Sequence, residues 1–277
     1  MDIALDKEYS PSMWSRRFST GDKVLEFHVN FVTEESRRVR EKFKYETISY
    51  GTKVNENFDI FGVDLPADAP IVVYVHGGYW QQLTKEVSAY CVDPLVSNGY
   101  KVVVVEYDLC PTVRLSDLVQ QMAKCGAFIL NELTFCGHSA GAHLILCMID
   151  KLITTEVTVL PVTSLYLISG IYDLTDLQHT SINDANILSV DASNVEQLSP
   201  LKFNLSKWSY QVFRVNIYVA EDDSPTFIKQ SLKLFSRMND KTSKAKVRFV
   251  ENCDHFDIVE KLSEKSFEIT QDLINKK

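Results

Sequence analysis

Short apolar runs alternate with amphipathic stretches along most of the chain. The runs are rich in β-branched residues, as is typical of buried strands, and they lie at 71–75, 101–107, 133–136, 164–169, 213–219 and 246–250. Between them, apolar residues recur at helical spacing at 84–97, 114–130, 140–153, 225–238 and again after residue 255. This alternation predicts an α/β fold in which helices cover both faces of a mostly parallel sheet.

Two regions depart from the alternation. Near the start, a charged helical segment at 32–43 precedes two short alternating runs, 46–50 and 57–61, which predict an antiparallel strand pair at one sheet edge. Later, residues 174–208 have a mixed polar sequence without clear periodicity. Because a structureless loop of that length is uncommon in a compact domain, we expect an insertion with short helices there. We expect residues 1–277 to form a single domain.

Composition narrows the function classes. The chain has 277 residues and a net charge of −8, without any basic block, which argues against nucleic acid or an anionic membrane as a partner. Its first residues lack the profile of a signal peptide, and no apolar stretch reaches the ~18 residues of a membrane span. The six cysteines lack the spacings of a zinc site. We therefore expect a cytoplasmic protein with free thiols that acts on a small molecule without a metal or cofactor.

A glycine-flanked serine follows one of the predicted strands. The motif is Gly137-His138-Ser139-Ala140-Gly141, directly after the run at 133–136. A strand that turns sharply into a helix through Gly-x-Ser-x-Gly exposes the serine hydroxyl at the tip of the turn. The glycines are needed because the turn strains the backbone and leaves no room for a Cβ atom. Ser139 is therefore a candidate nucleophile, and the alternative is an ordinary serine cap at a helix start.

A second glycine-rich turn follows the strand predicted at 71–75. It reads His76-Gly77-Gly78-Tyr79-Trp80 and indicates a loop of exposed backbone amides. In α/β-hydrolases the loop after this strand and the residue after the nucleophile donate N–H groups to the oxyanion hole. Such donors stabilise the charge that develops on a carbonyl oxygen under attack. By this pattern the donors are Gly78, Tyr79 and Ala140.

The remaining members of a hydrolase triad are expected in the order acid, then histidine. His255 is the only histidine beyond His179, and it follows the last predicted strand, so it is the candidate base. Three consecutive carboxylates at 221–223 end the preceding strand. We prefer Asp223 as the acid because the next residues, Ser-Pro, are typical of a helix start. Asp173, after the strand at 164–169, is the alternative.

These motifs together resemble the kynurenine formamidase (arylformamidase) family of α/β-hydrolases. The resemblance spans nearly the whole chain and rests on the segments 76–80, 137–144 and 223–225, on His255, and on 9–12 and 169–174. His-Gly-Gly-Tyr-Trp is the most specific of them, because related hormone-sensitive-lipase-like esterases usually carry a third glycine where Tyr79 stands. One departure is Ala220, since glycine is expected before the acidic loop.

The resemblance implies hydrolysis of N-formyl-L-kynurenine to L-kynurenine and formate, in tryptophan degradation, with no cofactor. The segment 174–208 is then expected to lie over the active site as a small lid. The substrate-binding residues expected from the motifs are His76, Gly77, Tyr79, Trp80 and His138.

Several interpretations stay open at this stage. The rings of Tyr79 and Trp80 either close a small acyl pocket or simply pack under the loop. His138 and His143 either pack in the interior or line the pocket. A broad-specificity carboxylesterase and a non-catalytic ligand-binding member of the fold are the alternative functions. A homodimer is compatible with the sequence.

Overall fold

The central sheet holds eight strands among the residues that the computed structural model describes, namely 3–129, 133–155, 160–208, 211, 213–242 and 245–275. Their bounds are β1 Tyr45–Ser49, β2 Asn57–Phe61, β3 Ile71–Val75, β4 Lys101–Val105, β5 Leu133–His138, β6 Val162–Ile168, β7 Arg214–Asp222 and β8 Ala245–Asp254. The order across the sheet is β1-β2-β4-β3-β5-β6-β7-β8. Strand β2 is antiparallel to β1 and β4, and the other neighbours are parallel, which confirms the predicted mostly parallel sheet and the antiparallel pair.

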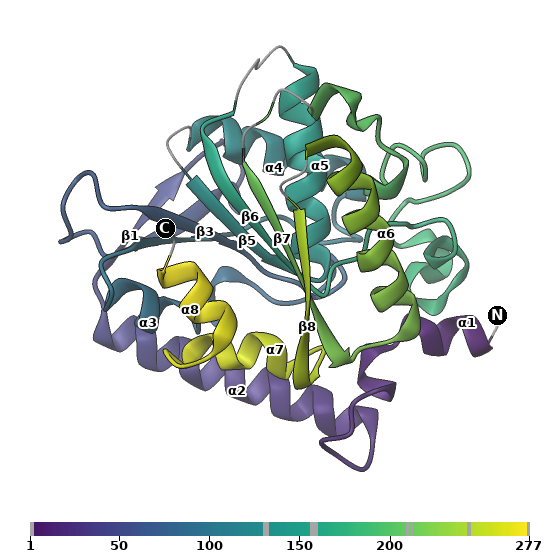
Figure 1. Ribbon diagram of the computed structural model, residues 1–277, viewed down its shortest axis with the longest axis horizontal. Coiled ribbons are helices and arrows are strands. Elements are labelled where there is room, and N and C mark those ends of the chain that lie inside the picture. Colours follow the sequence, from purple (N-terminus) through teal and green to yellow (C-terminus); the bar gives the residue numbers. More distant parts are fainter. Residues whose placement is uncertain are drawn as a thin grey trace.

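Helices lie on both faces of this sheet (Figure 1). They are α1 Ile3–Glu8, α2 Gly21–Lys42, α3 Val92–Val96, α4 Leu115–Phe128, α5 Ala140–Thr154, α6 Pro225–Thr242, α7 Asp257–Glu260 and α8 Glu268–Ile274. Helices α4, α5 and α6 cover one face, and α2, α3, α7 and α8 cover the other. Alternate residues of β3 and β4 enter the two resulting hydrophobic cores, and this explains why the central strands are apolar at nearly every position.

The helix predicted at 84–97 is present only in part. The structure has a single 3-10 turn, Lys85–Val87, and then the short helix α3. Arg40 of α2 donates hydrogen bonds to the backbone oxygens of Lys85 and Glu86, at 2.6 and 3.0 Å. The Lys85 oxygen also accepts from the backbone N–H of Ser88 at 3.2 Å, which closes the 3-10 turn. The contact with α2 thus binds the oxygens at the end of this turn, and the helix does not continue through it. The helix predicted after His255 is likewise divided, into α7, the 3-10 turn Lys261–Ser263 and α8.

Helix α2 is longer than the predicted segment at 32–43. It begins after Thr20, whose side chain accepts a hydrogen bond from the backbone of Lys23 and caps the helix. Its first half exposes Leu25, Phe27 and Val29 to solvent. Apolar residues therefore lie on both the buried and the exposed sides of that half. Its sequence does not show the one-sided spacing of apolar residues that marks a surface helix.

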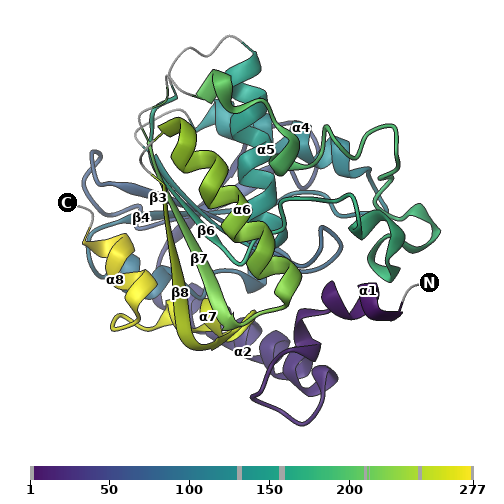
Figure 2. The same ribbon diagram turned by 45° about the vertical axis from the view of Figure 1, so that its right-hand side comes forward.

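The insertion at 174–208 contains short helices, as predicted. All are 3-10 turns: Leu177–His179, Ser181–Asn186, Pro200–Lys202 and Leu205–Trp208. Long-range hydrogen bonds hold it in place, and two of them come from α5 and α1. The His143 ring of α5 donates to the backbone oxygen of Leu198 at 2.7 Å, and the backbone N–H of Ser181 donates to Asp6 of α1 at 2.7 Å. Figure 2 shows α1 lying against this part of the chain, so the N-terminus and the insertion meet.

Two further features concern the cysteines and the length of the helices. All six cysteines are buried and unpaired, as expected for structural thiols. Through the described part of the chain, no helix combines the length and apolar character that crossing a membrane requires.

Candidate active site

Ser139 occupies the turn between β5 and α5. Its backbone has φ 53° and ψ −117°, a region that non-glycine residues rarely adopt and that costs on the order of 1–3 kcal/mol. The backbone N–H of Ser139 donates to the oxygen of Ile168 on β6 at 2.9 Å, which fixes the strained turn to the neighbouring strand. The residue sits directly ahead of the first helical residue, Ala140. The first N–H groups of a helix have no acceptor within it, so those at the start of α5 are available to hydrogen-bond a negatively charged oxygen.

The flanking glycines are explained by close packing. A Cβ on Gly141 would lie 2.1 Å from the backbone oxygen of Val75, and one on Gly137 would lie 2.5 Å from Cδ1 of Ile145. Contacts this short do not occur in folded proteins, so any side chain at either position would push α5 away from the sheet. The glycines thus let the start of α5 approach β3 and hold the serine at the sheet edge.

Asp223 and His255 are in direct contact at the carboxyl ends of β7 and β8. Nδ1 of His255 lies 3.1 and 3.0 Å from the two carboxylate oxygens of Asp223, and each residue is only 3% exposed. Because an ionised carboxylate only accepts hydrogen bonds, Nδ1 carries the proton, and Nε2 of the neutral ring is an acceptor. The backbone N–H of Ser224 also donates to Asp223, at 2.9 Å, and fixes the rotation of the carboxylate.

The other carboxylates of the sequence analysis have different partners. Asp173 accepts hydrogen bonds from Thr175 and lies 3.7 Å from the amine of Lys202. Glu221 accepts from the backbone of Asn252, and Asp222 pairs with Arg16. The structure therefore brings Asp223, and not the alternative Asp173, to the histidine.

The loop after β3 has a left-handed backbone at three successive residues. The φ angles are 95° at Gly78, 49° at Tyr79 and 60° at Trp80. A Cβ on Gly78 would lie 2.4 Å from the oxygen of Gln82, so only glycine fits. The Tyr79 hydroxyl donates to the backbone oxygen of Tyr9 at 2.6 Å. Two adjacent non-glycine residues in this conformation indicate a loop held in shape by its surroundings.

The rings of two residues of this loop, His76 and Trp80, pack against buried rings outside the loop. His76 stacks on Tyr107 with ring centroids 4.3 Å apart, and the indole of Trp80 meets the ring of His143 edge-on at 4.9 Å. His76, Trp80 and His143 are all fully buried. Burial also lowers the pKa of His143 to about 4, so its ring is neutral. His76 and Trp80 thus offer no surface to a ligand in this conformation, whereas Tyr79 stays partly exposed.

His138 contacts the loop that carries His255. Its Nε2 donates to the backbone oxygen of His255 at 2.8 Å, and the two rings lie 4.7 Å apart. Burial lowers the pKa of His138 well below its usual 6.5, and the neighbouring His255 and His28 rings lower it further. The neutral ring serves as a fixed donor to the backbone of His255. Gly77 lies against it, since a Cβ there would be 3.0 Å from Nδ1 of His138.

The sequence analysis missed the contribution of the N-terminal segment. Arg17 binds Asp254, the residue before His255, and the backbone oxygen of Glu8 accepts from Ser224, the residue after Asp223. The position of Asp254 beside the candidate base was visible in the sequence. Nothing in the sequence linked it to Arg17, which lies 237 residues away.

The chain has relatives that match it along almost its entire length. It is 33% identical to kynurenine formamidase of Drosophila melanogaster, over 98% of this chain and 96% of that protein. It is 34% identical to kynurenine formamidase of Salmo salar, with 98% and 94% covered. The BD-FAE family model matches residues 59–233, which include the Ser139 turn, the loop after β3 and Asp223.

Solved structures share the fold. A crystal structure from Silicibacter sp. TM1040 superposes with a TM-score of 0.78 at 24% identity, covering 96% of this chain and 97% of that one. Carboxyl esterase 2 of Tuber melanosporum gives 0.67 at 17% identity, covering 84% and 86%. These similarities establish the α/β-hydrolase fold. They do not indicate the activity, because one fold supports many activities. The full-length identity to those relatives, on a fold with the expected strand order, shows that this chain belongs to the kynurenine formamidase family.

Proposed function

We propose that this chain hydrolyses the formamide bond of N-formyl-L-kynurenine and releases L-kynurenine and formate, a step of tryptophan degradation. The observation that carries the substrate is the 33–34% identity to two kynurenine formamidases over 98% of the chain. The buried contact between Asp223 and His255 and the strained turn at Ser139 support a serine hydrolase mechanism.

The first half of the reaction forms a formyl-enzyme. Nε2 of His255 takes the proton of the Ser139 hydroxyl as its Oγ attacks the formyl carbon, and Asp223 holds the imidazole in the required tautomer. The carbonyl oxygen becomes negatively charged, and the backbone N–H groups of Gly78, Tyr79 and Ala140 stabilise it. When the C–N bond breaks, His255 returns the proton to the departing aromatic amine, which leaves as L-kynurenine.

The second half releases formate. A water molecule gives a proton to His255 while its oxygen attacks the formyl ester on Ser139. The same backbone donors stabilise the second tetrahedral intermediate. The ester bond then breaks, the serine oxygen recovers its proton from His255, and formic acid departs and loses its proton to water as formate. The cycle needs no group beyond the side chains and backbone amides named here and the attacking water.

The pocket that we propose is small on the acyl side, because a formyl group carries only hydrogen beyond its carbonyl. Tyr79, which is partly exposed as a residue, closes this side, and the contact of its hydroxyl with the backbone oxygen of Tyr9 holds the ring in place. Trp80 and His76 do not contact the substrate, and their buried rings hold the loop in place. His138 holds the backbone of His255 through its hydrogen bond. The 174–208 insertion covers the larger, aromatic end of the substrate as a lid.

The test is a comparison of kcat/KM for N-formylkynurenine and for short-chain aryl esters on the purified chain. We expect the formamide to be preferred. A large preference for the esters would instead favour a broad carboxylesterase. A fluorophosphonate probe addresses the non-catalytic alternative, because it labels only an activated serine. Absence of labelling at Ser139, together with no turnover of either substrate, would overturn the proposal.

A further inference from the structure

The turn that carries His255 is closed by the side chain of the residue before it. One carboxylate oxygen of Asp254, Oδ1, accepts hydrogen bonds from the backbone N–H groups of Phe256 and Asp257, both at 2.8 Å. Asp254 is only 2% exposed. The direction of the His255 backbone therefore depends on the rotation of the Asp254 side chain.

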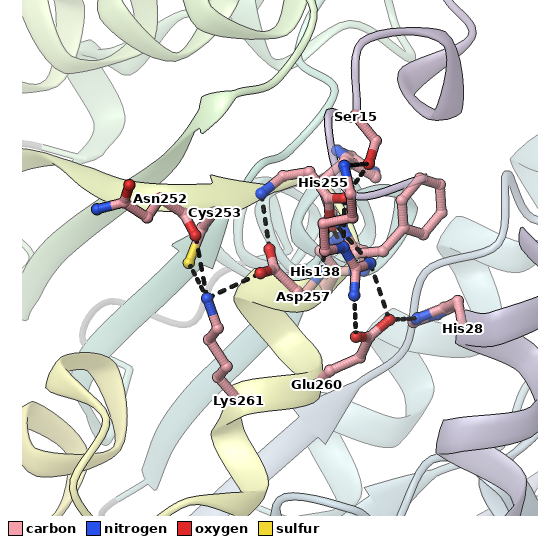
Figure 3. A network of polar contacts seen from close by, with 12 residues as sticks. Ser15, His28, His138, Asn252, Cys253, His255, Asp257, Glu260 and Lys261 are labelled. Atoms are coloured by element: carbon pink, nitrogen blue, oxygen red, sulfur yellow. Dashed lines mark hydrogen bonds and ion pairs between the residues drawn. The ribbon is translucent and has the colours of Figure 1, made fainter. Parts of the chain in front are cut away.

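A distant arginine fixes that rotation. Nε of Arg17 donates to Oδ2 of Asp254 at 2.7 Å, and Nη2 donates to Oδ1 at 3.2 Å. The same guanidinium binds Glu260 of α7, with Nη1 2.7 Å from Oε2. The Ser15 hydroxyl also donates to Asp254. The His28 ring donates to Glu260, as Figure 3 shows. Such a planar, two-sided fork suits arginine and cannot be reproduced by lysine.

Arg17 is the cation that two buried carboxylates of this cluster share. Burial raises the pKa of Asp254, but hydrogen bonds from Arg17 and Ser15 outweigh it and hold the pKa at about 2, so the group is ionised. Asp254 and Glu260 are both nearly fully buried and share this guanidinium. Without Arg17, these two buried carboxylates would repel each other, and their charges would lack a buried cation. Rotation of Asp254 away from the turn would relieve the repulsion and would release the His255 backbone.

We propose that Arg17 is a positioning residue for His255, which acts through Asp254 and makes the N-terminal segment part of the catalytic apparatus. This inference rests on the proposed role of His255 as the base. Three contacts then fix that residue: Asp223 on the ring, His138 on the carbonyl oxygen and the Arg17–Asp254 pair on the turn. Because catalytic groups must be held to a fraction of an ångström, loss of one contact lowers the rate of the chemical step more than substrate binding.

The test is the Arg17→Met variant, which keeps much of the side-chain volume and removes the charge and donors. We expect kcat on N-formylkynurenine to fall ~10–100-fold, the scale of a misplaced catalytic group, with KM changed less than about twofold. The rate of fluorophosphonate labelling at Ser139 should fall by the same factor. Arg17→Lys should recover part of the loss, because it keeps the charge but not the fork.

The matched control is Arg37→Met. Arg37 also joins two carboxylates, Glu34 and Glu41, but it lies on the exposed surface of α2. We expect wild-type kcat and labelling from this variant. A double-mutant cycle with Asp254→Asn then tests the route: if Arg17 acts through Asp254, Arg17→Met should cost less kcat in the Asp254→Asn background than in the wild type.

The outcomes separate this inference from the proposed function. A folded Arg17→Met protein with wild-type kcat and labelling would overturn the role of Arg17 and leave the triad intact. Wild-type protein without activity and labelling would overturn the triad, and the role of Arg17 with it. Should Arg17→Met fail to fold, Arg17→Lys, which keeps the charge but loses the fork, gives the same readouts. A several-fold loss of kcat at constant KM would support the proposal, and no change would refute it.

Discussion

Replacing Asp223 with asparagine tests the assignment of the acid. The change preserves shape and removes the negative charge beside the His255 ring. The backbone N–H of Ser224, 2.9 Å from Oδ1, selects the amide oxygen for that position, which leaves the NH₂ group in place of Oδ2, 3.0 Å from Nδ1 of His255. Nδ1 then faces this donor as well as the amide oxygen, which is 3.1 Å away and already accepts from Ser224. The contact that holds the proton on Nδ1 is therefore weakened, and the tautomer with the proton on Nε2, which cannot accept the proton of Ser139, gains population.

The expected loss is large. The corresponding change in other serine hydrolase triads lowers kcat by roughly 10⁴, which is about 5 kcal/mol at 1.36 kcal/mol per factor of ten. We expect a loss of that order in kcat on N-formylkynurenine, followed by the absorbance of the kynurenine formed. Thermal unfolding should confirm that the variant is folded, since the amide keeps the Ser224 hydrogen bond.

Two sister variants serve as controls for this prediction. Asp173→Asn and Asp222→Asn remove carboxylates whose partners are Thr175, Lys202 and Arg16, so both should retain most of the activity. If Asp173→Asn lost more activity than Asp223→Asn, or if folded Asp223→Asn kept a tenth of wild-type kcat, the reasoning from the His255 contact would be refuted.

Two further predictions concern the loop after β3 and the Arg17 cluster. In the wild type we expect kcat/KM to fall from formyl to acetyl to butyryl esters, by ~1–3 kcal/mol per methylene. Tyr79→Gly should flatten this preference, whereas Tyr79→Phe, which keeps the ring, should not. Equal acyl-length profiles in all three proteins would exclude Tyr79 from the pocket. The pKa of Asp254, about 2 when folded against ~3.9 when unfolded, contributes stability above about pH 4 that is lost as the pH falls toward 2. The unfolding free energy, measured by urea titration from pH 5 to pH 3, should therefore fall less in Asp254→Asn, and parallel pH profiles would contradict this.

The sheet was predictable because its centre is buried on both faces. Strands such as β3 and β5 are continuous apolar runs for that reason, and their ends in the sequence lie close to those in the structure. The break in the helix predicted at 84–97 was not predictable, because two of its backbone oxygens, those of Lys85 and Glu86, bind Arg40, a residue of another helix. Local periodicity carries no information about such a partner.

The candidate site likewise contains residues that the sequence predicts and contacts that it does not predict. Ser139 and His255 follow from local motifs and chain order, and Asp223 was preferred over Asp173 because a helix starts after it. The supporting contacts come from residues far apart in the chain. The pair of Arg17 with Asp254 and the bond from His138 to the His255 backbone span 237 and 117 residues. A single sequence gives no signal for pairs of this kind. The tight turns that hold the reactive groups are recognisable in the sequence because they require glycine.

The measurement that tests the central claim most directly is the rate of N-formylkynurenine hydrolysis by Ser139→Ala. The variant removes one oxygen atom at a buried turn and leaves the Asp223–His255 contact in place. We predict a folded protein that has lost at least about three powers of ten in kcat, because the members of a triad act as a unit. A folded Ser139→Ala protein that keeps a tenth of wild-type activity would contradict the account.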